Sequence, residues 1–312
     1  MQRLKFILQK YYHVIKDAGN EFLEDNGTKL SASLAYYTIF SIGPLLMVVI
    51  TLAGMFYKKA AVTTQIFEQL AQLVGENGAA QLKSILDNIS AEKNTTLFSI
   101  IGVVVLIFGA TGIFTEIQSS INYIWSIKAK PKKSWLKYLS DRLLSFSLII
   151  GSGFLMLVTL FVNLLMDLLN ARVQRFLGDS DTILIQVVNV GMLYVVVTLL
   201  FAVVYKVLPD AKIYWKDALT GASFTGVLFL IGKFLIGYYL GKSQSISTYG
   251  AAASIIILLS WVYYSSIILY FGAEFTKVYA IKWGKGITVF DTAVYIVKHE
   301  TRELPNVKHP TL

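Results

Sequence analysis

The feature that most constrains this chain is a series of long apolar runs separated by charged loops. Six such runs lie near residues 33–57, 97–124, 143–166, 183–205, 217–240 and 250–276. Each is close to the roughly 20 residues that a helix needs to cross a ~30 Å hydrocarbon core. With 15% charged residues and a mean hydropathy of +0.60, the chain is too apolar for a soluble domain. We therefore expect an all-α fold, a polytopic membrane helical bundle of about six transmembrane helices.

Basic residues indicate how this bundle is oriented. Twenty of the 28 Lys and Arg residues lie before the first run, after the second and fourth runs, and after the last; seven lie in the other three loops. Basic loops stay in the cytoplasm, so both termini are expected there. The expected organisation is a cytoplasmic N-terminal segment (1–32), a six-helix transmembrane domain (33–281) and a cytoplasmic tail (282–312).

Two segments outside the apolar runs have the periodicity of amphipathic helices. Apolar residues recur at helical spacing over residues 4–23, with lysines elsewhere, which favours a helix lying on the inner leaflet. The first outer loop, 58–96, contains two short amphipathic stretches joined by a polar turn at 75–78. These two helices form either a small cap on the outer face or a layer on the headgroups.

The first apolar run carries more polar chemistry than an anchor needs. Pro44 lacks an N–H and crowds the preceding turn, so a kink or break is expected near residues 40–44. Ser33, Tyr37 and Ser41 recur every four residues and share one face of a helix. That face either packs on neighbouring helices through its hydroxyl groups or lines an internal cavity.

Two acidic residues fall inside the predicted spans. Ser260, Tyr263, Tyr270 and Glu274 form one stripe of the last run, in which hydroxyl groups lead to a carboxylate. Glu116 lies in the second run. At 1.5 Å per residue, Glu116 and Glu274 both lie about 12–14 Å from the cytoplasmic border. They either line one inner-leaflet site or anchor their helices separately at the interface.

Lys233 lies much further from the cytoplasmic border, in the fifth run. Asn163 and Asp167, late in the third run, have a similar depth. The sequence predicts a polar pair between Lys233 and Asp167 or Asn163 in the outer half of the membrane. The alternative is that Lys233 extends to the headgroups.

The sequence offers little for enzyme chemistry. It has no cysteine, and its three histidines, His13, His299 and His309, lie in the terminal segments. No cluster has the spacing of metal ligands, and no phosphate-binding glycine loop or nucleophile motif is present. We expect no catalytic activity, no metal, no cofactor and no nucleic-acid partner.

Four segments together resemble one family. They are LSASLAYYTIFSIGPLLMVVI, GATGIFTEIQSSINYIW, KDALTGASFTGVLFLIGKFLIGYYL and STYGAAASIIILLSWVYYSSIILYFGAEFTKV. The pattern, above all Tyr249-Gly250, Trp261 and Gly272-Ala273-Glu274, is similar to the YihY/virulence factor BrkB family over residues 10–285. The resemblance implies a multi-pass protein of the bacterial cytoplasmic (inner) membrane. Members were once labelled ribonuclease BN, have been linked to serum resistance and envelope integrity, and include candidate transporters.

The leading hypothesis is a permease or exporter of a small solute, ion or lipid-like molecule. Its polar cavity would lie between the first, second and sixth spans, where the glutamates bind a proton, a cation or a cationic or amphipathic solute. The alternative is a non-transporting protein that organises the envelope, with lipid handling between the two; ribonuclease activity is the least favoured. Membrane lipids are expected partners, and an oligomer is possible. The candidate substrate-binding residues are Tyr37, Ser41, Pro44, Glu116, Trp261, Tyr263, Tyr270 and Glu274.

Overall fold

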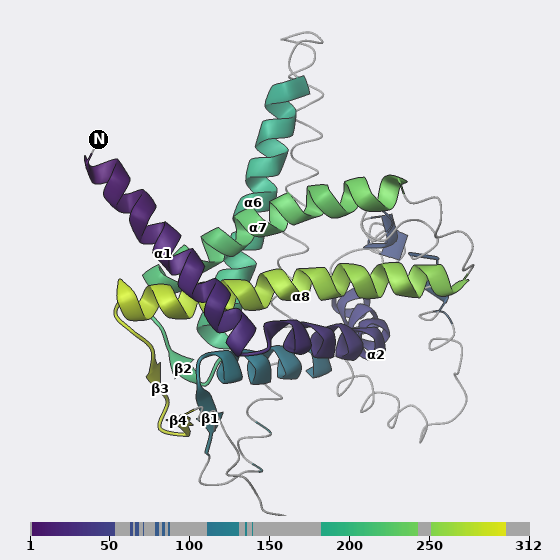
Figure 1. Cartoon of the computed structure of the whole chain (residues 1–312). Coiled ribbons are helices and arrows are strands. Elements are labelled where there is room, and N and C mark those ends of the chain that lie inside the picture. The colour runs from purple at the N-terminus through teal and green to yellow at the C-terminus, as the bar shows by residue number, and fades with distance from the viewer. Residues whose placement is uncertain are drawn as a thin grey trace, which may run out of the picture.

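The computed structural model describes residues 2–53, 111–130, 182–242 and 251–297, with isolated residues between 63 and 87 and at 135 and 139 (Figure 1). The described part is mostly helical, as predicted. Its long helices are α1 (Gln2–Glu24), α2 (Gly27–Ala53), α6 (Thr182–Val207), α7 (Trp215–Lys242) and α8 (Ala251–Lys282), and a further helix covers 111–124.

Two of the described stretches, Gly27–Met47 and Trp215–Leu235, are long and apolar enough to cross a membrane. α6, α7 and α8 cover the fourth, fifth and sixth predicted spans. The third span, 143–166, lies outside the described residues, so the six-span topology and the orientation of the termini stay predictions. The isolated described residues of the outer loop are helical, and Ile66 and Phe67 among them are buried.

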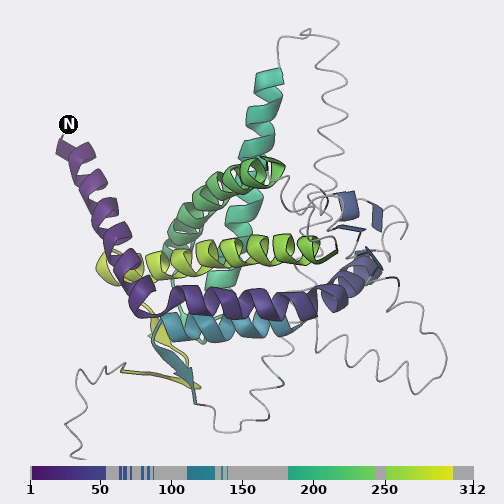
Figure 2. The ribbon, with the colours of Figure 1, turned by 45° about the vertical axis from the view of Figure 1, so that its right-hand side comes forward.

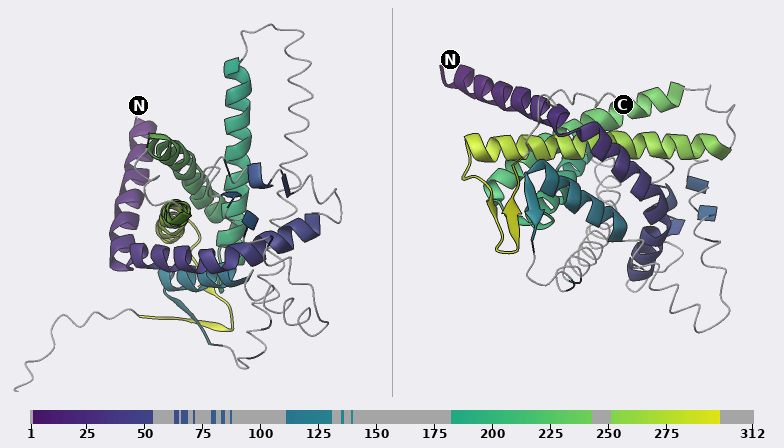
Figure 3. Two further views of the ribbon diagram at one scale, coloured as in Figure 1. Left: turned by 90° about the vertical axis from the view of Figure 1, so that its right-hand side faces the viewer. Right: turned by 60° about the horizontal axis from the view of Figure 1, so that its bottom comes forward.

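α8 is the centre of the described structure. It contacts α1, α2 and α7, while α6 packs against α7; Figure 3 (left) looks almost along α8 and shows the other helices around it. Gly272 allows the close approach of α7, because a Cβ atom there would lie 2.9 Å from Cβ of Thr225. The Tyr205 hydroxyl donates to the Leu269 carbonyl at 2.8 Å, which fixes α6 to α8 as well.

α1 packs on α8 through one apolar face. Val14, Ala18 and Phe22, spaced at four residues, are buried, whereas Tyr11 and Ile15 remain partly exposed. The amphipathic helix predicted from the sequence is therefore present, but its apolar face covers protein. The chain changes direction at Asn26, which has a φ of 54°, and α2 begins at Gly27, leaving α1 at a steep angle (Figure 3, left). This start precedes the predicted domain boundary at residue 33.

α2 continues as a helix through Pro44. Of the kink or break expected near Pro44, the helix has a kink and no break: Figure 2 shows that the far end of α2 bends away from its first half. A proline inside a helix removes one N–H donor and crowds the preceding turn, which bends the axis without ending the helix.

Two small antiparallel sheets lie beside one end of the bundle, and an all-α prediction misses them. β1 (Ile127–Ala129) pairs with β4 (Ala293–Tyr295), and β2 (Ala211–Lys212) pairs with β3 (Thr288–Val289). The registers are Lys128 opposite Val294 and Lys212 opposite Thr288. The first part of the predicted polar tail is thus folded onto two inter-helix loops.

Candidate functional site

Glu274 lies at the heart of a buried charge cluster at the end of α8 that carries the sheets. Its side chain is 0% exposed, and Oε2 lies 2.7 Å from Nζ of Lys277, one turn further along α8. Lys277 also donates to the Ile124 carbonyl at 2.8 Å, which joins α8 to the helix over 111–124.

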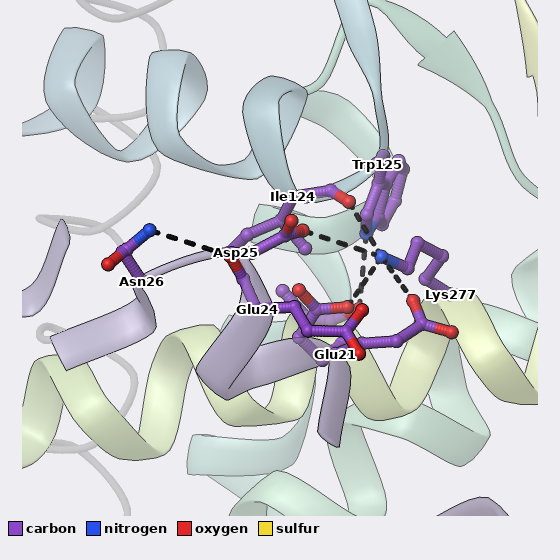
Figure 4. A network of polar contacts seen from close by, with 9 residues as sticks. Glu21, Glu24, Asp25, Asn26, Ile124, Trp125 and Lys277 are labelled. Carbon is purple, nitrogen blue, oxygen red and sulfur yellow. Dashed lines mark hydrogen bonds and ion pairs between the residues drawn. The ribbon is translucent and has the colours of Figure 1, made fainter. Parts of the chain in front are cut away.

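Glu21 of α1 and Asp25, in the turn directly after α1, supply two further carboxylates to the same lysine, as Figure 4 shows. Nζ of Lys277 lies 2.5 Å from Oε2 of Glu21 and 3.7 Å from Oδ2 of Asp25. The carboxyl group of Asp25 also lies against that of Glu274. Side-chain exposure falls from 39% at Glu21 to 9% at Asp25 and 0% at Glu274. The cluster therefore leads from the surface of α1 into the centre of the bundle.

Packing around the cluster explains why these groups meet. Phe22, one residue after Glu21, packs edge-to-face on Phe271 of α8 with ring centroids 5.8 Å apart. The indole N–H of Trp125 donates to the Ala273 carbonyl at 3.1 Å. α1 and the 111–124 helix are thus fixed on either side of the turn that carries Glu274.

The charge balance of this Glu274 cluster is unequal. One ammonium group faces three carboxyl groups, two of which are buried. Buried charge is costly unless it is paired, and two carboxylates in contact repel when both are ionised. Glu21 is the most exposed of the three, and for the two buried carboxyl groups one proton or another cation beside Lys277 would balance the charge. The buried part of the cluster therefore suits a site that takes up and releases positive charge.

The second predicted glutamate has a simpler environment. Glu116 is half-buried, and its Oε1 accepts a hydrogen bond from the Ser33 hydroxyl of α2 at 2.6 Å. Tyr270, fully buried one turn before Glu274, lies near Ser120 and within electrostatic range of Glu116. Tyr270 is thus close to Ser120 and Glu116 and lies one turn before Glu274 on α8.

The other predicted residues of the first and last spans divide into two groups. Ser41 is buried against the helix over 111–124, where a Cβ atom on Gly112 would lie 2.8 Å from its hydroxyl oxygen. Tyr37, by contrast, is 45% exposed, and Pro44 is half-buried. Ser33, Tyr37 and Ser41 consequently do not all face the same neighbour.

Exposure along the α8 stripe decreases towards Glu274. Ser260 is exposed, Tyr263 is half-buried, and Tyr270 and Glu274 are fully buried. Trp261 lies outside this stripe and packs on Phe229 of α7, with ring centroids 5.9 Å apart. The stripe thus runs from an accessible end to the buried cluster, and Trp261 contributes to helix packing.

The proposed outer-half pair stays a prediction. Lys233 is exposed on α7, and Asn163 and Asp167 lie outside the described residues. Within the described ranges, no group of three or more His, Asp or Glu side chains is arranged to hold a metal ion. His13 is exposed, and its ring lies 2.7 Å from the Gln9 carbonyl of the same helix.

Sequence reasoning missed three residues of the cluster. Lys277 counts there only among the basic residues after the last apolar run, Glu21 falls within the amphipathic segment 4–23, and Asp25 lies just beyond that segment. Two signals were available: the i, i+3 spacing of Glu274 and Lys277, and the acidic run Glu21, Glu24, Asp25 within a basic N-terminal segment.

A second buried polar contact was also missed. Asn122 donates to Oδ2 of Asp210 at 2.9 Å and accepts from the Asp210 N–H at 2.8 Å. This pair fixes the loop before β2 to the helix over 111–124. The same helix contacts the Glu274 cluster two residues later, where the Ile124 carbonyl accepts a hydrogen bond from Lys277.

Comparison with known proteins gives a consistent picture. The family described as Virulence factor BrkB matches residues 18–289. A UPF0761 membrane protein of Tolumonas auensis is 30% identical over 79% of this chain and 78% of its own length. A UPF0761 membrane protein of Alteromonas mediterranea is 28% identical over 81% of this chain and 83% of its own length. The putative ribonuclease-like protein YfkH of Bacillus subtilis is 24% identical over 83% of this chain and 92% of its own length. No solved structure matches.

Proposed function

The chain belongs to the virulence factor BrkB family of membrane proteins, and we propose that it is a permease or exporter with an inward-facing polar site. The site is formed by α2, the helix over 111–124 and α8. Glu274 and Glu116 bind a proton, a cation, or a cationic or amphipathic solute there. The substrate belongs to the small solutes, ions or lipid-like molecules.

One observation carries this proposal: two buried carboxyl groups in contact with each other inside a bundle of apolar helices. The carboxyl group of Glu274 is 0% exposed and lies against that of Asp25, which is 9% exposed. An ionisable group in a membrane helix is costly and marks a pathway for ions or protons. The exposed Glu21 gives the cluster a route to water, and Lys277 lies between Glu21 and Glu274.

The protein is a multi-pass protein of the cytoplasmic membrane in this proposal, with both termini in the cytoplasm. The excess of basic residues before α2 and after α8 supports this orientation. Trp215 and Trp283 are exposed near the same end of the bundle, as expected for aromatic side chains at a membrane interface. The Glu274 cluster then lies near the cytoplasmic border.

A non-transporting role in envelope organisation is the second candidate. The observation that favours it is the close packing of the polar groups on α2: Ser41 is buried against the 111–124 helix, and Glu116 already accepts a hydrogen bond from Ser33. In that case these groups hold helices together. A ribonuclease role is suggested only by names, that of YfkH and the former family label, and no observation among the described residues favours it.

A ligand screen tests the proposal. Purified protein would be heated with panels of ions, metabolites and lipids, alongside Glu274→Gln, Glu116→Gln and the control Glu24→Gln. Glu24 is an exposed residue on the same helix as Glu21. A ligand of the site should stabilise wild type and the control but neither of the other two variants.

The substitutions also separate a functional role from a structural one. Both glutamine variants should express and fold while losing ligand binding and transport. Failure of both to fold would assign the two glutamates to the framework. If no ligand shifts the unfolding of wild type, the envelope-organising alternative becomes the better account.

A further inference from the structure

A groove between α1 and α7 lies apart from the Glu274 cluster. Its volume is about 500 Å³, and it is lined by Tyr11, Lys216, Leu219, Thr220, Ser223, Phe224 and Val227. The α7 residues recur at helical spacing and occupy one face. None of them belongs to the cluster around Glu274, so the groove has no part in the function proposed above.

The end of the groove near the start of α7 is polar and basic. Lys216 lies in the first turn of α7 and is exposed, and the Tyr11 hydroxyl comes from α1. No carboxylate is among the lining residues. The nearby Asp217 is buried and accepts a hydrogen bond from the Lys285 N–H at 3.0 Å. Thr220 donates its hydroxyl to the Lys216 carbonyl at 2.8 Å, and the Ser223 hydroxyl bonds to that of Tyr194. The lining thus offers a phosphate one positive charge, at Lys216, and the Tyr11 hydroxyl.

The rest of the groove is apolar. Leu219 and Val227 are 39% and 45% exposed, and Phe224 stacks on Phe275 of α8 with ring centroids 4.0 Å apart. Tyr11 also stacks on Phe275, so aromatic rings form the floor. From Lys216 to Val227 the α7 axis rises about 16 Å, comparable to one half of a ~30 Å hydrocarbon core. A phosphate group at one end and an acyl chain along the rest would fit this polarity and length.

We propose that this groove binds one anionic phospholipid of the cytoplasmic leaflet. Its phosphate lies at Lys216 and the Tyr11 hydroxyl, and an acyl chain runs over Leu219, Phe224 and Val227. Basic grooves on the cytoplasmic side of membrane helices recognise anionic headgroups in this way. Tyr11 belongs to α1, so the bound lipid would bridge α1 and α7.

Lipid titrations of the purified full-length chain test this assignment. Phosphatidylglycerol, phosphatidylcholine and glycerol phosphate would be added separately, and binding followed by native mass spectrometry and thermal unfolding. We expect wild type to prefer phosphatidylglycerol, and Lys216→Ala to bind it about fivefold more weakly. The control Lys212→Ala removes an exposed lysine of β2 that is not among the lining residues and should bind as wild type does.

Two further arms identify what occupies the groove. Val227→Trp fills the apolar part without changing charge and should weaken phosphatidylglycerol binding as well. Glycerol phosphate alone should not stabilise the protein, because it cannot use the apolar wall. Equal binding of both phospholipids, or equal effects of Lys216→Ala and Lys212→Ala, would overturn the proposal. Unchanged binding in Val227→Trp would do the same even if Lys216→Ala failed to fold.

Discussion

Glu274 and Glu116 lie at similar predicted depths, yet their surroundings differ. Glu274 is fully buried, contacts Lys277 and lies against the carboxyl group of Asp25. Glu116 is half-buried and accepts one hydrogen bond from Ser33. Distance from the membrane border is therefore a poor guide to the state of an intramembrane carboxylate. What distinguishes Glu274 is that Glu21 and Asp25 add two further carboxyl groups around a single lysine, Lys277.

The largest expected effect comes from removing that lysine. Lys277→Met leaves the buried carboxyl groups of the Glu274 cluster without their cation, and breaking a buried pair on one side costs about 3–5 kcal/mol. Denaturant unfolding in detergent micelles should show this loss. Lys282→Met is the matched control, because Lys282 pairs with Asp17 at the surface. The double variant Lys277→Met/Glu274→Gln should recover part of the loss. Equal stability of Lys277→Met and Lys282→Met would show that the buried cluster matters no more to the fold than the surface pair.

A smaller effect is expected from the hydrogen bond between Trp125 and the Ala273 carbonyl, next to Glu274 on α8. Trp125→Phe keeps the buried aromatic packing but removes the N–H donor to the Ala273 carbonyl. The expected cost is about 1 kcal/mol, since that is typical of one intramolecular hydrogen bond. Thermal unfolding would measure it against Trp215→Phe, an exposed tryptophan. An effect no larger than that of Trp215→Phe would show that Trp125 does not help to hold this turn of α8.

The contact at Glu116 should matter less. Ser33→Ala removes the hydroxyl donor to a carboxylate that is only half-buried, so water can replace part of the hydrogen bond. We expect a loss of about 0.5–1 kcal/mol in the free energy of unfolding. Ser119→Ala is the control, because Ser119 is an exposed serine on the same helix as Glu116. A loss approaching that of Lys277→Met would mean that the two glutamates are equally important to the fold.

The smallest effect concerns the exposed ion pair between Lys282 and Asp17. A hydrogen bond from Lys282 lowers the pKa of the Asp17 carboxyl below its ordinary value. Because the folded-state pKa is the lower one, the pair stabilises above the unfolded-state pKa of about 4 and loses this contribution as the pH falls through the folded-state value. The difference in melting temperature between wild type and Lys282→Met should therefore shrink on acidification. An exposed pair contributes at most about 1 kcal/mol, and a difference that grows at low pH would contradict this assignment.

The sequence predicted the helices well because lipid permits few alternatives. Apolar runs at 183–205, 217–240 and 250–276 correspond to α6, α7 and α8, whose backbone groups are satisfied within each helix. The small sheets were missed because they depend on partners far apart in the chain. β1 pairs with β4 across all the residues of α6, α7 and α8, and a three-residue strand gives almost no local signal.

The candidate site was predicted only in part for the same reason. Glu274, Tyr270 and Glu116 stood out because polar groups are rare inside apolar runs. Glu21 and Asp25 lie in a polar segment, where carboxylates are ordinary. Their importance follows from the packing of α1 on α8, which involves Phe22 and Phe271 and is a long-range contact. Spacing alone groups Tyr37 with Ser33 and Ser41, but only the two serines lie against the helix over 111–124, and Tyr37 is exposed.

Labelling of single cysteines tests most directly whether a water-filled cavity leads towards Glu274. The natural chain has no cysteine, so Ser41→Cys and Tyr263→Cys each introduce one unique thiol. Lys285→Cys at the surface and Ala222→Cys in the core provide the labelled and protected references. Our account predicts that a hydrophilic, membrane-impermeant reagent modifies Tyr263→Cys and, more slowly, Ser41→Cys in folded protein, and that a ligand found in the screen slows both reactions. Protection of both positions to the level of Ala222→Cys would contradict a cavity and leave the Glu274 cluster as part of the framework.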